Sequence, residues 1–294
     1  MRDPLSSDKP TTTKEQPPGH QQCENHEDLV ESKQQLQNLN IDRMRSIERE
    51  VQQTQALVGQ RCTIDVLFDT CDLSFELCEK FADLLRKCNL KYWHPVRRDG
   101  NCFYRSLGFL FFKLIADGRL SYTELKGALE RRLDYLHEKQ QFDRQIIYDF
   151  MEIVDEAMQS ILSKKGVIAL EDIFDIFNDD MISNSIIVIL RYCTTSYLLA
   201  YQDDCFPFID FENYLNMKDF TQKEVEPMGQ EADNLQITAL IKSLDLDVTI
   251  FDVNASVRNN ISLIKINEEC KNHLNKDVPI FLLFVPGHYE ILYD

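Results

Sequence analysis

Helical patterns fill the middle of this 294-residue chain, and strand patterns gather at its end. Between residues 120 and 245 the apolar residues are spaced mainly as in helices. Strand-like sequence follows in DVTIFDV (247–253), PIFLLFV (279–285) and HYEILYD (288–294), and Pro286-Gly287 forms a turn between the last two. Helices that come first and strands that come last predict an α+β fold, in which helices flank a mostly antiparallel sheet.

Three regions follow one another along the chain. Residues 1–27 contain four prolines and few large apolar residues, which predicts a disordered tail. Residues 28–60 are mostly polar. Between Leu36 and Val51 the apolar residues recur mainly at intervals of three or four, which predicts a thin amphipathic arm. This arm either becomes ordered against a partner or folds back on its own domain. Residues 61–294 have the apolar content of a domain with a substantial core.

The net charge of −17 limits the partners of the chain. Nucleic-acid binding needs a surplus of Lys and Arg to neutralise phosphates, and this chain lacks that surplus. Residues 141–240 alone hold 19 Asp and Glu against 6 Lys and Arg. Two interpretations of this segment stay open: solvated helix faces, or an acidic surface that attracts a basic protein partner.

Nine cysteines are present, but their context argues against disulfides and zinc. The first residues, MRDPLSSDKP, lack the apolar core of a secretory signal, so we expect a reducing compartment: the cytoplasm, with the nucleus as a second location. The cysteines do not have the spacing of zinc knuckles. The longest apolar runs, at 107–112 and 185–190, are too short to span a membrane. We therefore expect no metal, no cofactor and no membrane contact.

One cysteine, Cys102, stands where a turn meets a long apolar helix, in RRDGNCFYRSLGFLFFKLIA (97–116). At a helix start, unpaired backbone N–H groups and the positive end of the helix dipole favour the thiolate. The preceding Asp99-Gly100-Asn101 can turn its N–H groups toward one point and hold a developing oxyanion. These features predict a nucleophile for acyl transfer.

A thiolate also needs an acid or base, and His288 has the clearest context among the six histidines. It opens the final strand, so the side chain of Glu290 points to the same face and could orient the imidazole by a hydrogen bond. Cys102, His288 and Glu290 thus predict the arrangement of a thiol protease. The other histidines are interpreted as parts of the tail (His20, His26) or as ordinary surface residues (His94, His137, His273).

These motifs resemble the otubains of the ovarian-tumour (OTU) family of cysteine deubiquitinases. The resemblance rests on DGNCFYR (99–105), FND (177–179), VEPM (225–228) and PGHYEILY (286–293), and it covers roughly residues 60–294. It implies a papain-like OTU fold and hydrolysis of the isopeptide bond at the C terminus of ubiquitin. It also implies a preference among the linkages of polyubiquitin chains.

Carried over to this chain, the resemblance makes Cys102 the nucleophile, His288 the general base and acid, and Asp99 a residue that helps to build the oxyanion hole. Glu290 stands where the family usually has Asp or Asn, so the group that orients His288 stays open. Residues 41–67 resemble the N-terminal arm of the longer, otubain-1-like members. The resemblance therefore implies ubiquitin and polyubiquitin chains as partners, and ubiquitin-conjugating enzymes as partners of the arm.

Three functions remain open from the sequence. The first is a ubiquitin isopeptidase. The second is a protein that binds ubiquitin and a conjugating enzyme and inhibits ubiquitin transfer without cleavage, and the unusual Glu290 keeps this alternative open. The third is an unrelated cysteine hydrolase with the same activated thiol.

Overall fold

The computed structural model describes residues 54–70, 73–162, 169–210, 212–253, 261–267, 273–275 and 278–294, together with Glu50 and Lys164. The predicted tail lies outside these residues. The predicted arm also lies outside them, apart from Glu50 and residues 54–60. The helices and strands below all belong to the part of the chain from Glu50 onward.

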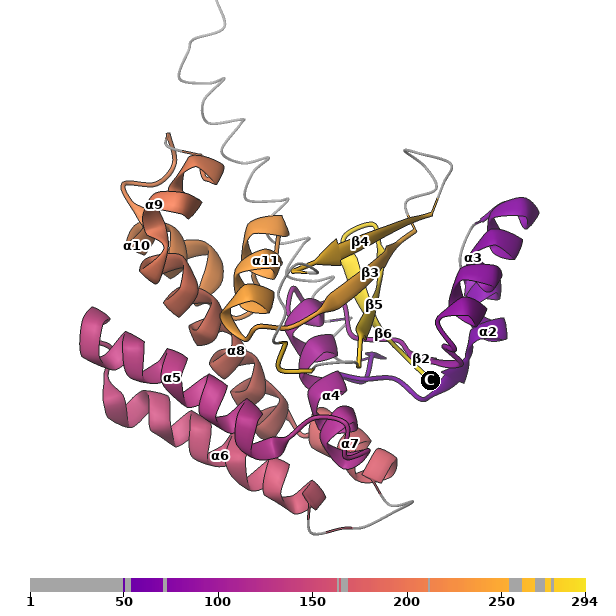
Figure 1. Ribbon diagram of the computed structural model, residues 1–294, viewed down its shortest axis with the longest axis horizontal. Helices are drawn as coiled ribbons and strands as arrows, with labels where there is room; N and C mark the ends of the chain where they lie inside the picture. Colours follow the sequence, from indigo (N-terminus) through magenta and orange to yellow (C-terminus); the bar gives the residue numbers. More distant parts are fainter. Residues whose placement is uncertain are drawn as a thin grey trace, which may run out of the picture. The chain divides into compact units, whose positions relative to one another are not determined.

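Helices make up most of this part of the chain (Figure 1). Several begin at a side chain that caps the first turn, as when the Ser74 hydroxyl accepts a hydrogen bond from the Leu77 N–H. The α-helices are α2 (Ile64–Thr70), α3 (Phe75–Lys87), α4 (Cys102–Ala116), α5 (Tyr122–Gln140), α6 (Arg144–Leu162), α7 (Ala169–Asn178), α8 (Asp180–Ala200), α9 (Gln202–Cys205), α10 (Met217–Phe220) and α11 (Asn234–Ser243). A 3₁₀ turn, η1 (Phe206–Phe208), follows α9, and a π-helical turn, η2 (Thr221–Val225), follows α10.

Six strands form one sheet in the order β1-β2-β6-β5-β3-β4. They are β1 (Cys62–Thr63), β2 (Tyr92–His94), β3 (Val248–Asp252), β4 (Ser262–Ile266), β5 (Ile280–Val285) and β6 (His288–Tyr293). The pair β3–β5 is parallel, and the other four pairs are antiparallel. The predicted α+β class with a mostly antiparallel sheet is therefore confirmed, and β6 lies inside the sheet between β2 and β5.

The sheet lies between two hydrophobic cores, and Figure 1 shows helices on both of its sides. Successive side chains of a strand point to opposite faces, so Ile250 packs in the larger core with α4, whereas Phe251 packs in the smaller core against Phe81 of α3. The larger core also contains buried residues of α5, α6, α8 and α11. Helices therefore cover both faces of the sheet.

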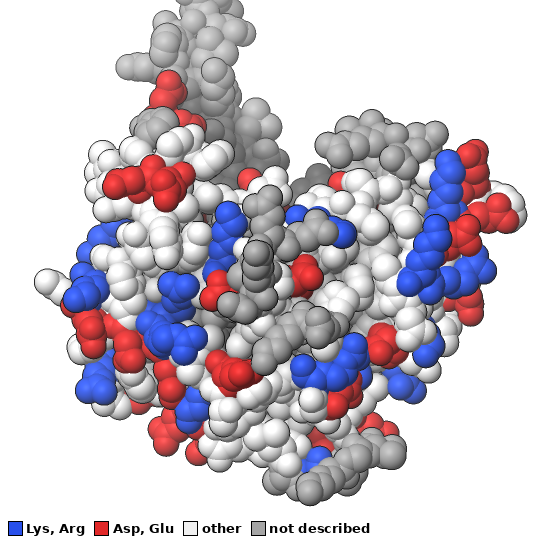
Figure 2. Space-filling view, viewed as in Figure 1, with Lys and Arg blue, Asp and Glu red and all other residues white. Residues whose placement is uncertain are grey.

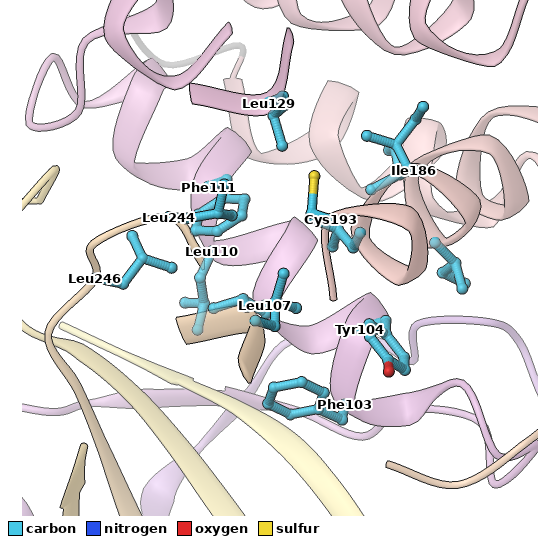
Figure 3. Close-up of a cluster of buried hydrophobic side chains, with 14 of the residues drawn as sticks. Phe103, Tyr104, Leu107, Leu110, Phe111, Leu129, Ile186, Cys193, Leu244 and Leu246 are labelled. Carbon is cyan, nitrogen blue, oxygen red and sulfur yellow. The ribbon is translucent and has the colours of Figure 1, made fainter. Parts of the chain in front are cut away.

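Helix α4 is buried on nearly all sides, as 13 of its 15 residues are buried. Figure 3 shows Phe103, Leu107 and Phe111 from α4 among side chains of neighbouring elements. A methyl group at Gly108 would lie 2.8 Å from the Ile186 side chain, so this glycine permits the close approach of α4 and α8. The long apolar run after Cys102 thus reflects a helix that is enclosed by the core.

Helix α8 has the length and apolar composition of a membrane span, although 72% of its most apolar window is buried within the protein. Most of its large apolar residues, among them Ile187 and Leu190, belong to the larger core or pack against it. The charged side chain of Arg191 lies in the same helix and is also fully buried. The apolar character of α8 is accounted for by packing in the core.

The last residues of the predicted arm pack against the domain that follows. Leu57 and Val58 are buried, and Val58 forms a β-bridge with Val96. The Asn178 side chain pairs with both backbone groups of Val58: it accepts from the N–H at 3.2 Å and donates to the carbonyl at 3.0 Å. The chain is therefore fixed in the domain from Leu57 onward.

Acidic and basic side chains are interspersed over the face in Figure 2. A group of acidic side chains lies near α9, where Asp203 and Asp204 are exposed. The mixture of charges is that expected for solvated helix faces. An acidic surface that attracts a basic partner stays a prediction.

Candidate active site

Cys102 is the first residue of α4, the position at which the sequence predicted a helix start. Its side chain is buried, with 6% of the residue exposed. The first N–H groups of a helix have no acceptor within that helix. The N-cap residue Asn101 makes no side-chain hydrogen bond to them. The thiol therefore lies beside backbone donors that the N-cap side chain leaves uncapped.

The turn before Cys102 depends on a glycine. Gly100 has a φ of +72°, a left-handed conformation that glycine adopts at little cost. A Cβ atom at this position would also lie 1.9 Å from the carbonyl oxygen of Gly229. Two segments that are distant in the sequence thus meet at van der Waals contact beside the thiol.

Asp99 shapes this turn through its carboxylate. Oδ1 accepts a hydrogen bond of 3.0 Å from the Asn101 N–H. Both carboxylate oxygens accept from the buried guanidinium of Arg105, each at 2.9 Å. Burial would raise the pKa of the Asp99 carboxyl, but the hydrogen bonds and charge of Arg105 outweigh it, so the pKa is lowered. Asp99 therefore acts as an anion that folds the turn.

Fewer backbone N–H groups are free to bind an oxyanion than the sequence predicted. The sequence suggested that the N–H groups of Asp99-Gly100-Asn101 converge on one point. In the structure the Asn101 N–H is already used by Asp99. The donors that remain for an oxyanion include those of the first turn of α4, among them the N–H of Cys102.

His288 and Glu290 lie on β6, and the imidazole of His288 interacts with the thiol of Cys102 at the start of α4. The imidazole is buried, and its Nε2 is 3.4 Å from Oε1 of Glu290. The two side chains thus share one face of the strand, as the period of two predicted. The aromatic ring of Tyr289, between them in the sequence, packs on Phe103 of α4 with ring centroids 5.4 Å apart.

The charge state of His288 depends on its two neighbours. Burial lowers the pKa of the imidazole, but its interactions with the Cys102 thiol and the Glu290 carboxylate outweigh burial and raise the pKa to about 9. At neutral pH the ring is therefore protonated and can donate a proton. Together, the three residues can supply a nucleophile, a proton donor and a group that orients the ring.

His94 is buried, not on the surface as its sequence context suggested. Its Nδ1 is 2.8 Å from the Gly59 carbonyl oxygen, and its Nε2 is 3.0 Å from the Tyr293 hydroxyl. Burial lowers the pKa of this imidazole, which keeps it neutral. His94 is a core residue that ties β2 to Gly59, within the predicted arm, and to Tyr293 of β6.

Three residues that build the site were not predicted from the sequence: Arg105, Arg191 and Gly229. Arg105 lies one helical turn after Cys102, so its position in DGNCFYR could have indicated a partner for Asp99. Arg191 is a lone charge within SIIVILRYCTTSYL, and an isolated charge in a buried helix signals a polar role. Among the described residues, no group of three or more His, Cys, Asp or Glu side chains is arranged to hold a metal.

Comparison with known proteins adds a family to this geometry. The family described as Peptidase C65 Otubain matches residues 49–294. The ubiquitin thioesterase OTUB1 of Homo sapiens is 29% identical over 250 residues, which is 84% of this chain and 86% of that protein. The ubiquitin thioesterase OTUB2 of Mus musculus is 30% identical over 209 residues, which is 67% of this chain and 79% of that protein.

Solved structures agree with these relatives. A structure of OTUB1 with ubiquitin aldehyde and UBCH5B~Ub superposes with a TM-score of 0.72 at 25% identity, and it covers 88% of this chain and 98% of that one. A structure of OTUB1 with ubiquitin aldehyde and UBC13~Ub gives a TM-score of 0.70 at the same identity, over 87% of this chain and 98% of that one. The predicted papain-like OTU fold is confirmed by this similarity.

Proposed function

The chain belongs to the otubain family of cysteine peptidases, and from this premise we propose that it is a cysteine-dependent deubiquitinase. It hydrolyses the isopeptide bond between the ubiquitin C terminus and an amino group. The observation that carries the proposal is the grouping of Cys102, His288 and Glu290 at the junction of α4 and β6. Such a grouping provides nucleophilic and acid–base catalysis within one site.

The reaction follows from the charges of this site. The Cys102 thiolate attacks the carbonyl carbon of the isopeptide bond, and the electron pair of the carbonyl moves to its oxygen. The first-turn N–H groups of α4 stabilise this oxyanion. Protonated His288 donates its proton to the leaving amine as the C–N bond breaks, which leaves a thioester on Cys102.

Hydrolysis of the thioester completes the cycle. Neutral His288 removes a proton from water, and the resulting hydroxide attacks the thioester carbonyl. The thiolate leaves, and the ubiquitin carboxylate is released. Glu290 holds the imidazole through Nε2 in both steps, so that Nδ1 can serve the thiol, water and the leaving group.

Ubiquitin, polyubiquitin chains and ubiquitin-conjugating enzymes are the partners of this enzyme. Support comes from the solved OTUB1 complexes, which contain ubiquitin aldehyde together with UBCH5B~Ub or UBC13~Ub. The arm predicted at residues 28–60 is the proposed contact for a conjugating enzyme or the second ubiquitin of a chain, and the tail at residues 1–27 stays a prediction. Contact with a second ubiquitin would give the enzyme its preference among chain linkages.

Inhibition of ubiquitin transfer by binding alone is a second candidate function. The distance of 3.4 Å between His288 Nε2 and Glu290 Oε1 favours it, because this contact is longer than an ordinary charge-assisted hydrogen bond. A site that aligns only when ubiquitin binds would let the protein hold a charged conjugating enzyme without cleavage. The two functions use the same partners and differ only in turnover.

The cytoplasm is the proposed location of the enzyme, with the nucleus as a second one. A catalytic thiol needs a reducing environment to stay active. The six cysteines that the structure describes are all free thiols, in keeping with such an environment.

A ubiquitin with a C-terminal electrophile tests the function directly. We expect it to modify Cys102 alone, as judged by intact mass and peptide mapping, and diubiquitin of several linkages should be cleaved. Cys102→Ala should abolish both reactions. Cys78→Ala, which removes a half-buried thiol of α3, is the matched control and should change neither.

Two outcomes would contradict the proposal. Modification that persists in Cys102→Ala would place the nucleophile elsewhere. Modification of Cys102 without cleavage of any diubiquitin, together with inhibition of a conjugating enzyme, would favour the binding function.

A further inference from the structure

Arg191 of α8 is a positive charge enclosed in the protein, with no exposed surface. Burial of an ion without compensation costs several kcal/mol. Its hydrogen bonds in the described structure go to three backbone carbonyls and one side-chain amide, and its guanidinium lies 4.4 Å from the ring centroid of Tyr104. A buried charge held mainly by backbone groups fixes the positions of those groups.

The acceptors of Arg191 belong to two segments beside Cys102. In the turn, Nη2 donates to the Gly100 carbonyl at 3.3 Å and to Asn101 Oδ1 at 2.8 Å. In the facing segment, Nη1 donates to the Val225 carbonyl at 2.8 Å, and Nη2 donates to the Gln230 carbonyl at 2.7 Å. One guanidinium therefore joins the turn to residues 225–230.

The Asn101 side chain is drawn into this network. Its Oδ1 accepts from Arg191 and also from the Gly229 N–H, at 2.9 Å. At an N-cap, an asparagine oxygen ordinarily accepts from the second or third N–H of the helix. Asn216 does so at α10, where its Oδ1 accepts from the Asp219 N–H at 3.0 Å. Asn101 occupies the N-cap of α4 and makes no such bond.

The peptide group between Gly100 and Asn101 is held at both ends as well. Its carbonyl accepts from Arg191, and its N–H donates to Asp99. This peptide directly precedes the residue whose carbonyl begins the hydrogen-bond ladder of α4. Its orientation consequently sets the direction of the first free N–H groups of the helix.

We propose that Arg191 is a positioning residue for the oxyanion site: it holds the Asn101 side chain and the Gly100 carbonyl away from the start of α4, so that the N–H groups there stay open to the substrate. The inference rests on the proposed function through its acyl-transfer step, in which the oxyanion forms.

Two small reagents separate this role from activation of the thiol. With p-nitrophenyl acetate, the thiolate attacks the carbonyl carbon, and the carbonyl electron pair moves to the oxygen. The carbonyl then re-forms, p-nitrophenolate departs, and an acetyl thioester remains on Cys102. With chloroacetamide, the thiolate displaces chloride from a saturated carbon, and no oxyanion forms. The ratio of acetylation rate to alkylation rate therefore reports the oxyanion site alone, and neither reagent needs ubiquitin.

The rates are to be measured for wild type, Arg191→Lys, Asn101→Ala and the double variant, with the signal of Cys102→Ala subtracted. The wild-type ratio should exceed that of N-acetylcysteine. Arg191→Lys should lower the ratio by about tenfold to 100-fold, which is less than the effect of removing an oxyanion donor itself. Asn101→Ala should lower it less, and the double variant should match Arg191→Lys within about twofold, because the two residues act through one contact.

Several outcomes would overturn the inference. One is a wild-type ratio equal to that of N-acetylcysteine. Another is an equal fall of the acetylation and alkylation rates in Arg191→Lys. The third is a double variant whose loss equals the product of the two single losses. If circular dichroism shows no cooperative unfolding of Arg191→Lys, that variant is not folded and cannot serve as the test. Asn101→Ala then becomes the test, and an unchanged ratio of acetylation to alkylation in that variant counts against the proposal. A wild-type ratio above that of N-acetylcysteine, in a protein that cleaves no ubiquitin substrate, would reject ubiquitin as the substrate but retain the acyl-transfer site on which this inference rests.

Discussion

The Ser106 hydroxyl donates a hydrogen bond of 3.4 Å to the backbone carbonyl of Tyr289. Ser106 lies one helical turn after Cys102, and Tyr289 lies between His288 and Glu290. The bond therefore joins the helix of the nucleophile to the strand of the base, close to both.

Loss of this bond should affect turnover more than substrate binding. In Ser106→Ala the strand can shift relative to α4 by a fraction of an ångström, which misplaces His288. We expect kcat to fall about two- to fivefold, equivalent to about 0.5–1 kcal/mol, while KM stays unchanged. Steady-state hydrolysis of a ubiquitin with a fluorogenic leaving group measures both. Ser160→Ala, a substitution on α6, is the control, and an equal effect there would argue against a link between α4 and β6.

Gly100→Ala should abolish activity, whereas Gly118→Ala should not. Both glycines have left-handed backbone angles, with φ of +72° and +69°, so each substitution carries a strain of about 1–2 kcal/mol. At Gly118 a Cβ has no neighbour within 4 Å, whereas at Gly100 it would overlap the Gly229 carbonyl. Hydrolysis by Gly100→Ala should fall about 100-fold or more. Similar activities of the two variants would mean that the contact with Gly229 is dispensable.

The pH profile should report the coupling of His288 to its neighbours. The pKa of His288 is raised from 6.5 to about 9, so kcat/KM should decline on the alkaline side near pH 9 as the imidazolium loses its proton. The same shift stabilises the fold fully below pH 6.5, and this contribution is lost as the pH rises through 9. Rate profiles and thermal melts between pH 6 and 10 measure the two effects.

Glu290→Gln tests the assignment of the orienting carboxylate. It removes a charge that raises the pKa of His288 and keeps the shape of the side chain, so the alkaline decline should move to lower pH and kcat should fall. Glu290→Asp retains the charge and introduces a residue usual at this position in the family, so its profile should stay nearer to wild type. Identical profiles for wild type and Glu290→Gln would mean that another group orients the imidazole.

Two deletions separate the arm from the catalytic domain. Removal of residues 1–55 should preserve hydrolysis of the fluorogenic ubiquitin substrate and weaken cleavage of chains, because the latter needs a second ubiquitin on the arm. Removal of residues 1–60 also takes away the buried Leu57 and Val58 and should lower the free energy of unfolding by about 3 kcal/mol or more. If the protein without residues 1–55 cleaved chains as fast as wild type, the arm would have no role in chain cleavage.

Features that depend on local pattern could be predicted from the sequence. Periodicity located the strands around Ile250, Leu282 and Ile291, and it placed Cys102 at a helix start and His288 with Glu290 on one face. Strand β4 was missed because it lies at the edge of the sheet with three of its five residues exposed, so its sequence does not alternate. Strands β1 and β2 are too short to show a period.

Features that depend on tertiary contacts could not be predicted. The partners of Arg191 lie 34 to 91 positions away in the sequence, and those of His94 lie 35 and 199 positions away. No window of sequence contains both members of such pairs. The burial of a polar side chain is decided by these distant partners, so it becomes visible only when the chain is folded.

The place of β6 in the sheet has a consequence for biosynthesis. Strand β6 lies between β2 and β5 but follows all other described elements in chain order. A ribosome therefore delivers the nucleophile helix and most of the sheet before it delivers the strand that carries His288. Until that strand leaves the exit tunnel, the gap between β2 and β5 stays open and the thiol has no proton donor. Translation itself thus keeps the nascent protein inactive, and arrested chains that lack β6 should expose two unpaired strand edges to chaperones.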